Sequence, residues 1–135
     1  MTDTIAPVLP RVDDRDTRDY FDAARAGRLI VRHCKDCDSG LHPPSPHCFF
    51  CGSSNTHWKQ VAGTGTLYSW TVIEHTIHPA YPAPTTIVVV TLDDVSHVRL
   101  VGHIAGRPAL TMDMPMRVTF DALDDGVVQP NWVPV

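Results

Sequence analysis

The sequence of 135 residues has no hydrophobic run long enough to cross a membrane, which takes about 18 or more consecutive apolar residues. Its first 20 residues mix acidic and basic side chains and contain no apolar core, so they lack the form of a secretory signal peptide. We therefore expect a cytoplasmic protein with no membrane anchor, whose cysteines stay reduced.

The sequence also lacks the short motifs of self-contained active sites. It contains no G-x-S-x-G turn, no phosphate-binding glycine loop, no H-E-x-x-H pair and no G-x-G-x-x-G fingerprint. Its neighbouring carboxylates, Asp93-Asp94 and Asp124-Asp125, fall in turn-like contexts rather than in a catalytic constellation. We assign no catalytic residue to this chain.

Positive charge is scarce in the C-terminal part. The net charge is −4, with eight Lys or Arg against eight Asp or Glu in residues 1–59 but three against seven in residues 60–135. Grooves that bind nucleic acids are electropositive. The acidic C-terminal part therefore disfavours nucleic acid as a partner.

Twelve prolines argue against a mainly helical chain, and residues 15–27 are the exception. Apolar side chains recur there every three to four residues, and Gly27 is suited to end a helix. The apolar stripe comprises Tyr20, Phe21, Ala24 and Leu29. We predict an amphipathic helix whose Tyr20-Phe21 pair either packs on its own domain or binds a partner protein.

The only cysteines form two C-x-x-C pairs separated by ten residues: Cys34, Cys37, Cys48 and Cys51. Two such turns present four thiolates to one point and complete a tetrahedral shell for Zn²⁺. An iron site of the rubredoxin type and a pair of disulfides are the alternatives. A shell of four thiolates has no open position, so we interpret the site as structural.

The segments around the cysteines follow the order strand, turn, proline-rich loop, turn, strand, with the strands at Leu29–His33 and His57–Val61. This is the layout of a zinc ribbon. A unit this small has too little core to fold alone, so the metal contributes on the order of 10 kcal/mol or more. We interpret His33, His42 and His47, which lie near the cysteines in sequence, as ordinary surface residues.

From Val61 onward the sequence has only strand signals, beginning with a bend at Gly63-Thr64-Gly65. The first strand alternates, with Thr66, Tyr68, Trp70 and Val72 expected on one face. The run Ile87–Leu92 is rich in β-branched residues, and we expect it to be buried on both faces. Further strands are expected at 97–104, 116–120 and 127–133. This number and size of strands fits a five-stranded OB-type barrel.

The segment His75–Pro84 is long for a hairpin loop in a compact domain, and such loops are often functional. His75, His78 and Tyr81 supply hydrogen-bonding and stacking groups among prolines that limit its flexibility. The segment is therefore either a binding loop for a ligand or partner, or a solvated loop that closes one end of the barrel.

The order of these motifs resembles the zinc-ribbon plus OB-fold proteins once called domain of unknown function thirty-five. The resemblance rests on the C-x-x-C and C-x-x-C-G pairs, the segment Gly63–Val72 and the run His78-Pro79-Ala80-Tyr81, and it covers about residues 16–134. It implies a mainly β protein with an N-terminal arm and helix (1–28), a rubredoxin-like zinc ribbon (29–60) and a five-stranded OB-fold barrel (61–135).

The resemblance further implies a non-catalytic accessory subunit with a structural Zn²⁺. Its partner would be a thiolase-like enzyme, either a thiolase or a lipid-transfer-protein-type retro-aldolase, acting on acyl-CoA thioesters in steroid or lipid side-chain degradation. A coenzyme A thioester is a candidate ligand. Since the barrel has only three arginines, basic contacts to its phosphates would come from the partner or from Arg25, Arg28, Arg32 and Lys35.

Two other functions remain open on the residues alone. A single-stranded nucleic-acid-binding module would use Trp58, Tyr68 and Trp70 to stack on bases, against the charge argument above. A stand-alone enzyme would use the histidines of the His75–Pro84 loop.

Overall fold

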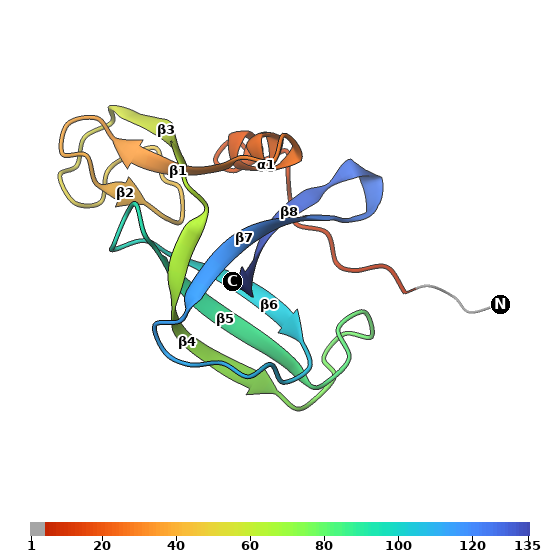
Figure 1. Cartoon of the computed structure of the whole chain (residues 1–135). Helices are drawn as coiled ribbons and strands as arrows, with labels where there is room; N and C mark the ends of the chain where they lie inside the picture. Colours follow the sequence, from red (N-terminus) through yellow and green to blue (C-terminus); the bar gives the residue numbers. More distant parts are fainter. Residues whose placement is uncertain (1–4) are drawn as a thin grey trace.

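The computed structural model describes residues 5–135, and the first four residues of the expected N-terminal arm lie outside it. One α-helix leads into a three-stranded sheet, followed by a five-stranded sheet that coils into a barrel (Figure 1). The predicted fold class, mainly β with one N-terminal helix, a four-cysteine ribbon and an OB-fold region, is confirmed. No helix within residues 5–135 has the length and apolar character needed to span a membrane.

Helix α1 (Arg18–Arg25) is shorter than the predicted 15–27 because residues 14–17 form a turn, in which the Asp14 carbonyl accepts from two following backbone N–H groups. Its last residue is Arg25, and Gly27, the predicted stop, follows two residues later with φ +73°. Here the N–H of Arg28 donates to the Ala23 carbonyl, closing the helix end. Ala23 and Ala24 are buried, and α1 packs on strands β1 and β8.

The ribbon sheet has the order β2-β1-β3, all antiparallel, with β1 at Leu29–Cys34, β2 at Gly40–Leu41 and β3 at Thr56–Val61. Strands β1 and β3 match the two predicted strands. Strand β2 was not predicted, because two residues are too few to show a period.

The barrel sheet has the order β6-β5-β4-β7-β8, with each neighbouring pair antiparallel. Its elements are β4 (Thr64–Ile73), β5 (Thr85–Leu92), β6 (Arg99–Ala105), β7 (Pro115–Ala122), the short 3-10 helix η1 (Asp124–Gly126) and β8 (Val128–Pro134). All five predicted strands are present, and the predicted bend falls at Gly63, just before β4.

One hydrophobic core joins the ribbon to the barrel. Leu29, Val31 and Val61, at the base of the ribbon, pack with buried barrel residues such as Leu67 and Trp132. A second, small buried cluster contains two of the cysteines and Leu41. The base of the ribbon is therefore held by the barrel core. Its tip is centred on the cysteine site and contacts the barrel at His97, whose Nε2 lies 3.1 Å from the Gly40 carbonyl oxygen and whose ring meets that of Phe50 edge-on.

The predicted alternation along β4 is wrong beyond Leu67. Leu67 pairs with Val90 and Ser69 pairs with Val89, so Tyr68 is an extra residue in a β-bulge. The bulge reverses the alternation, and Trp70, predicted on the face opposite Leu67, lies on the same side as Leu67. Aromatic and β-branched residues on both sides of Tyr68 hide this change from a pattern analysis.

Strand β5 is fully buried on one face only, which corrects the prediction for Ile87–Leu92. Val88 and Val90 are 0% exposed, whereas Ile87 and Val89 are half-buried. A small barrel has a single interior, so its outer face depends on other segments for cover. Inside the barrel the strands approach closely, and a Cβ on Gly65 would lie 2.4 Å from the Thr91 carbonyl oxygen.

Strands β6 and β8 lie side by side and close the barrel, yet no ladder joins them among the described residues. The buried Asn131 side chain replaces it. Its Oδ1 accepts from the backbone N–H of His103 at 2.8 Å, and its Nδ2 donates to the His103 carbonyl at 2.9 Å. Nδ2 also donates to Asp121 Oδ2 at 2.9 Å.

Candidate functional site

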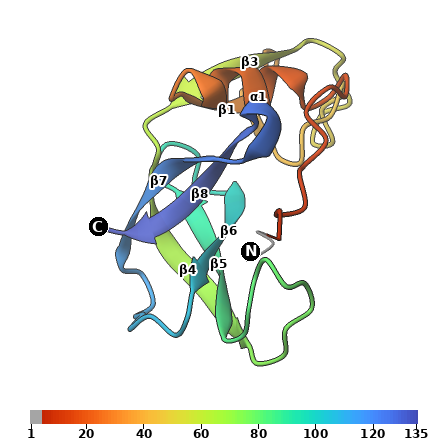
Figure 2. The same ribbon diagram turned by 90° about the vertical axis from the view of Figure 1, so that its right-hand side faces the viewer.

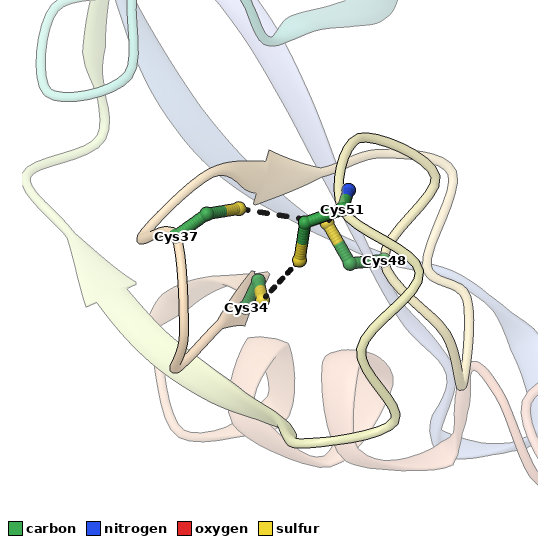
Figure 3. A group of neighbouring side chains, drawn as sticks. All are labelled: Cys34, Cys37, Cys48 and Cys51. Carbon is green, nitrogen blue, oxygen red and sulfur yellow. Dashed lines mark hydrogen bonds between the residues drawn. The ribbon is translucent and has the colours of Figure 1, made fainter.

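The four cysteines come together at the tip of the ribbon (Figure 3). Their Sγ atoms all lie within 4.8 Å of one another, and the pairs Cys34–Cys51 and Cys37–Cys48 are each separated by 3.6 Å. Cys34 and Cys48 are buried and the other two are exposed. No disulfide joins them, since separations of 3.6 Å are far longer than an S–S bond of about 2.05 Å.

Two similar turns position the sulfurs. In the first turn, the N–H of Cys34 donates to the Ser39 carbonyl, and the N–H of Asp38 donates to the Cys34 carbonyl. In the second turn, the N–H of Cys48 donates to the Ser53 carbonyl, and the N–H of Gly52 donates to the Cys48 carbonyl. Backbone N–H groups of the second turn also point at Cys48 Sγ, from 3.3 and 3.4 Å. Such bonds stabilise a thiolate.

The donor set fits one metal ion. A tetrahedral zinc with Zn–S bonds of about 2.3 Å holds its sulfurs about 3.8 Å apart, close to the separations found here. Within residues 5–135 these four side chains are the only group of three or more candidate ligands. They can hold a single ion with no open coordination position.

The exposed cysteines, Cys37 and Cys51, have pKa values shifted in opposite directions. The side chain and backbone of Ser39 lower the pKa of Cys37 to about 6. The backbone of Ser53 lowers the pKa of Cys51, but the neighbouring cysteines and loss of solvation outweigh it and raise that pKa to about 12. Four sulfurs this close cannot all ionise together unless a cation compensates their charge.

The second turn also needs its glycine, and we expect Gly52→Ala to destabilise the ribbon by about 1–2 kcal/mol. Gly52 has φ +78°, a conformation that disfavours any side chain even though the space around it is open. Denaturant unfolding of the zinc-loaded protein measures the change, with the exposed Ser54→Ala as control. Equal stability of Gly52→Ala and wild type would contradict this account.

The histidines near the cysteines lie outside the four-sulfur group. His47 is exposed, as predicted, and His42 is half-buried, so burial lowers its pKa. The prediction for His33 was wrong: its side chain is only 4% exposed, and its Nδ1 lies 2.9 Å from the Val31 carbonyl oxygen. That local hydrogen bond satisfies the ring in place of solvent.

The loop residues His75, His78 and Tyr81 lie together on the wall of a cavity of 510 Å³. The ring centroids of His78 and Tyr81 are 6.0 Å apart, and Tyr81 meets the ring of His103 edge-on at 5.3 Å. The sequence analysis named the three loop residues as candidates for binding a ligand or partner, but it did not name His103. That residue comes from β6, and only the pairing of strands brings it to the loop.

The N-terminal arm and strand β8 also line this cavity, through Val8, Leu9 and Pro10 and through Gln129 to Asn131. No local pattern in the sequence assigns the arm to this position. The arm and the β4–β5 loop lie on the same side of the barrel in both views (Figures 1 and 2).

The Tyr20-Phe21 pair occupies the helix, with the two rings edge-on at 5.2 Å. Tyr20 packs against the barrel core, and burial raises its pKa to about 12. Phe21 is half-buried. The helix therefore packs on its own chain through Tyr20, while a contact of this pair with a partner stays a prediction.

Models of known protein families match both the ribbon and the barrel. A family model described as the rubredoxin-like zinc ribbon domain of ChsH2 matches residues 21–57, and one described as the C-terminal OB-fold domain of ChsH2 matches residues 58–121.

Two curated proteins are similar in sequence. The chain is 35% identical over 111 residues to a probable enoyl-CoA hydratase alpha subunit of Thermomonospora curvata, covering 82% of this chain and 34% of that protein. It is 31% identical over 108 residues to the 3-oxo-4,17-pregnadiene-20-carboxyl-CoA hydratase alpha subunit of Mycobacterium tuberculosis, covering 78% and 34%. The chain thus spans about a third of the length of these relatives.

Two solved structures share the fold. A chain of the Ltp2-ChsH2(DUF35) aldolase matches with a TM-score of 0.81 and 31% identity, covering 93% of this chain and 98% of that chain. A DUF35-family protein of unknown function from Sulfolobus solfataricus matches with a TM-score of 0.60 and 14% identity, covering 79% and 77%. The second likeness concerns the fold alone.

Proposed function

The chain belongs to the ChsH2-type family that joins a rubredoxin-like zinc ribbon to an OB-fold domain, and from that membership we propose that it is an accessory subunit of an acyl-CoA-processing enzyme. The observation that carries the proposal is its similarity to nearly the whole of a chain in the Ltp2-ChsH2(DUF35) aldolase. The partner we propose is a thiolase-like or lipid-transfer-protein-like retro-aldolase acting on acyl-CoA thioesters, in steroid or lipid side-chain degradation.

The cysteine site supports a structural part in this role. We propose that Cys34, Cys37, Cys48 and Cys51 hold one Zn²⁺, which fixes the ribbon tip relative to the barrel. We retain the division into arm and helix (1–28), ribbon (29–60) and barrel (61–135), although one core runs through the last two. Catalytic groups would come from the partner.

The exposure of the four basic residues of the helix and ribbon decides which of them could contact the phosphates of coenzyme A. Arg25, Arg28 and Lys35 are exposed and available to phosphates. Arg32 is not, because its guanidinium bonds to Thr56 Oγ1 at 2.8 and 3.0 Å and lies over the Trp58 ring. If this chain meets the phosphates, we propose that the first three residues do so.

Binding of a single-stranded nucleic acid is the less well supported hypothesis. Tyr68 is exposed, but the Arg99 guanidinium lies 3.9 Å from its ring centroid and covers one face. The barrel is also acidic, whereas single-strand grooves are electropositive.

We expect the tagged chain to form a stable complex when it is co-expressed with a thiolase-like protein from the same organism. Size-exclusion chromatography measures the complex, and an acyl-CoA retro-aldol assay measures its activity. The complex should be active and the isolated chain inert. As a control, an unrelated thiolase-like protein should not co-purify. Turnover by the isolated chain, or failure to capture any thiolase-like protein from its own cells, would sink the proposal.

A further inference from the structure

The 510 Å³ cavity has the build of a small-molecule site. Its floor is the outer face of the sheet, where Ile87 of β5 pairs with His103 of β6 and Val101 lies beside them. The β4–β5 loop lines one side and the N-terminal arm another. The two segments lie on the same side of the barrel (Figure 2). The volume is within the range of about 300–1,000 Å³ typical of ligand pockets. A hollow bounded on several sides suits a compact molecule better than a protein surface.

The loop wall is held in place by its own hydrogen bonds. The backbone N–H of Tyr81 donates to the His78 carbonyl at 2.9 Å, and that of Ala80 donates to His78 Nδ1 at 3.2 Å. The N–H of Ala83 donates to Thr76 Oγ1 at 2.9 Å. The Tyr81 ring lies between two histidine rings, that of His78 on one side and that of His103 on the other. The wall is therefore largely preformed, which lowers the entropic cost of binding.

The chemistry of the lining selects the ligand. Among residues 5–135, no Asp, Glu, Lys or Arg lines the cavity, and aliphatic side chains from the sheet, the loop and the arm dominate it. A charged group buried there would lose its hydration and find no counter-ion. On the wall and floor of the cavity, the rings of His75, His78 and His103 and the Tyr81 hydroxyl offer hydrogen bonds. From this lining we infer that the cavity binds a neutral, mainly apolar small molecule with a hydroxyl or carbonyl group.

This inference goes beyond the accessory role proposed above. It assigns a site of this chain alone and excludes the phosphate-bearing part of a coenzyme A thioester from the cavity. Because it is tested without the partner, its failure is distinct from failure of the accessory role.

The test uses the zinc-loaded full chain and two matched fluorescent probes. N-phenyl-1-naphthylamine is neutral, and 8-anilinonaphthalene-1-sulfonate carries the same rings with an added sulfonate. We expect a saturable rise in fluorescence with the neutral probe and binding at least about tenfold weaker with the sulfonate. Absence of saturable binding, or equal binding of the two probes, overturns the inference.

A matched pair of variants locates the site. Ile87→Trp fills the cavity floor and should weaken binding of the neutral probe by at least about tenfold. Val89→Trp adds the same bulk two residues along, on the same face of β5 but outside the lining, and should leave binding within about twofold of wild type. Equal effects of the two variants overturn the assignment.

A second readout needs no variant, in case Ile87→Trp fails to fold. In ¹⁵N–¹H correlation spectra of the wild-type chain, addition of the neutral probe should shift the amide signals of Ile87, Val101 and His103. The signals of the ribbon tip, around Cys37 and Cys51, should stay unchanged. Shifts confined to residues outside the cavity contradict the inference.

Discussion

Cys34→Ser is expected to abolish zinc binding and unfold the tip of the ribbon. Cys34 is fully buried, and its Sγ lies 3.6 Å from that of Cys51 in the four-sulfur group. A serine hydroxyl is a poor zinc ligand, and three cysteines leave the tetrahedral shell open. Structural zinc sites contribute on the order of 10 kcal/mol to folding, and the small cluster at this tip has little else to replace it.

The loss should be confined largely to the tip. Leu29, Val31 and Val61 at the ribbon base belong to the barrel core, so the barrel strands should keep their structure. Zinc content by elemental analysis should fall from about one ion per chain to about zero, and limited proteolysis should cut between residues 35 and 55. We also expect co-purification with the partner to be lost.

The control for this variant is His47→Ala. His47 precedes Cys48 and is exposed, so removing it should leave zinc content, proteolysis and assembly unchanged. If Cys34→Ser retained one zinc per chain or still assembled with the partner, the ribbon would not be the metal-dependent unit described above.

The four-cysteine group could be predicted because its determinants are local. Each C-x-x-C turn positions its own pair of sulfurs, and the second ends at a glycine that the left-handed conformation favours. Spacing along the chain therefore carried nearly all of the information. The buried His33 is the exception, since its burial depends on how β1 pairs with its neighbours and not on the adjacent Cys34.

The cavity could be predicted only in part, because its walls come from distant segments. The length of the His75–Pro84 loop suggested a binding role for His75, His78 and Tyr81. The position of His103 depends on the register between β5 and β6, and that of the arm on tertiary packing. The bulge at Tyr68 likewise follows from barrel closure and has no mark in the residue pattern. A single sequence does not show how strands pair or where distant segments pack, so these three features could not be predicted from it.

Asn131→Ala is expected to destabilise the barrel by about 3 kcal/mol. The substitution removes the three hydrogen bonds that the side chain makes to His103 and Asp121. A lost neutral hydrogen bond costs about 1 kcal/mol, and a buried backbone group left without a partner costs about 1–3 kcal/mol. Water from the adjoining cavity offsets part of this cost, because Asn131 lies on the cavity's edge.

The variant Asn131→Asp separates hydrogen bonding from packing, because it keeps the size of the side chain. Its carboxylate still accepts from the His103 N–H, but its second oxygen then faces the His103 carbonyl and the Asp121 carboxylate. At neutral pH this repulsion should make Asn131→Asp at least as destabilising as Asn131→Ala. Below the pKa of the introduced carboxyl group, protonation restores a donor, so the difference from wild type should shrink as the pH falls.

Chemical denaturation of the zinc-loaded protein measures both variants, with Asn55→Ala as the matched control. Asn55 is exposed and hydrogen-bonds through its backbone, so its truncation should change stability by less than about 0.5 kcal/mol. A loss of less than about 1 kcal/mol in Asn131→Ala would mean that β6 and β8 stay together without the side-chain bridge. In that case the closure of the barrel would rest on the packing of Trp132 against Gly102.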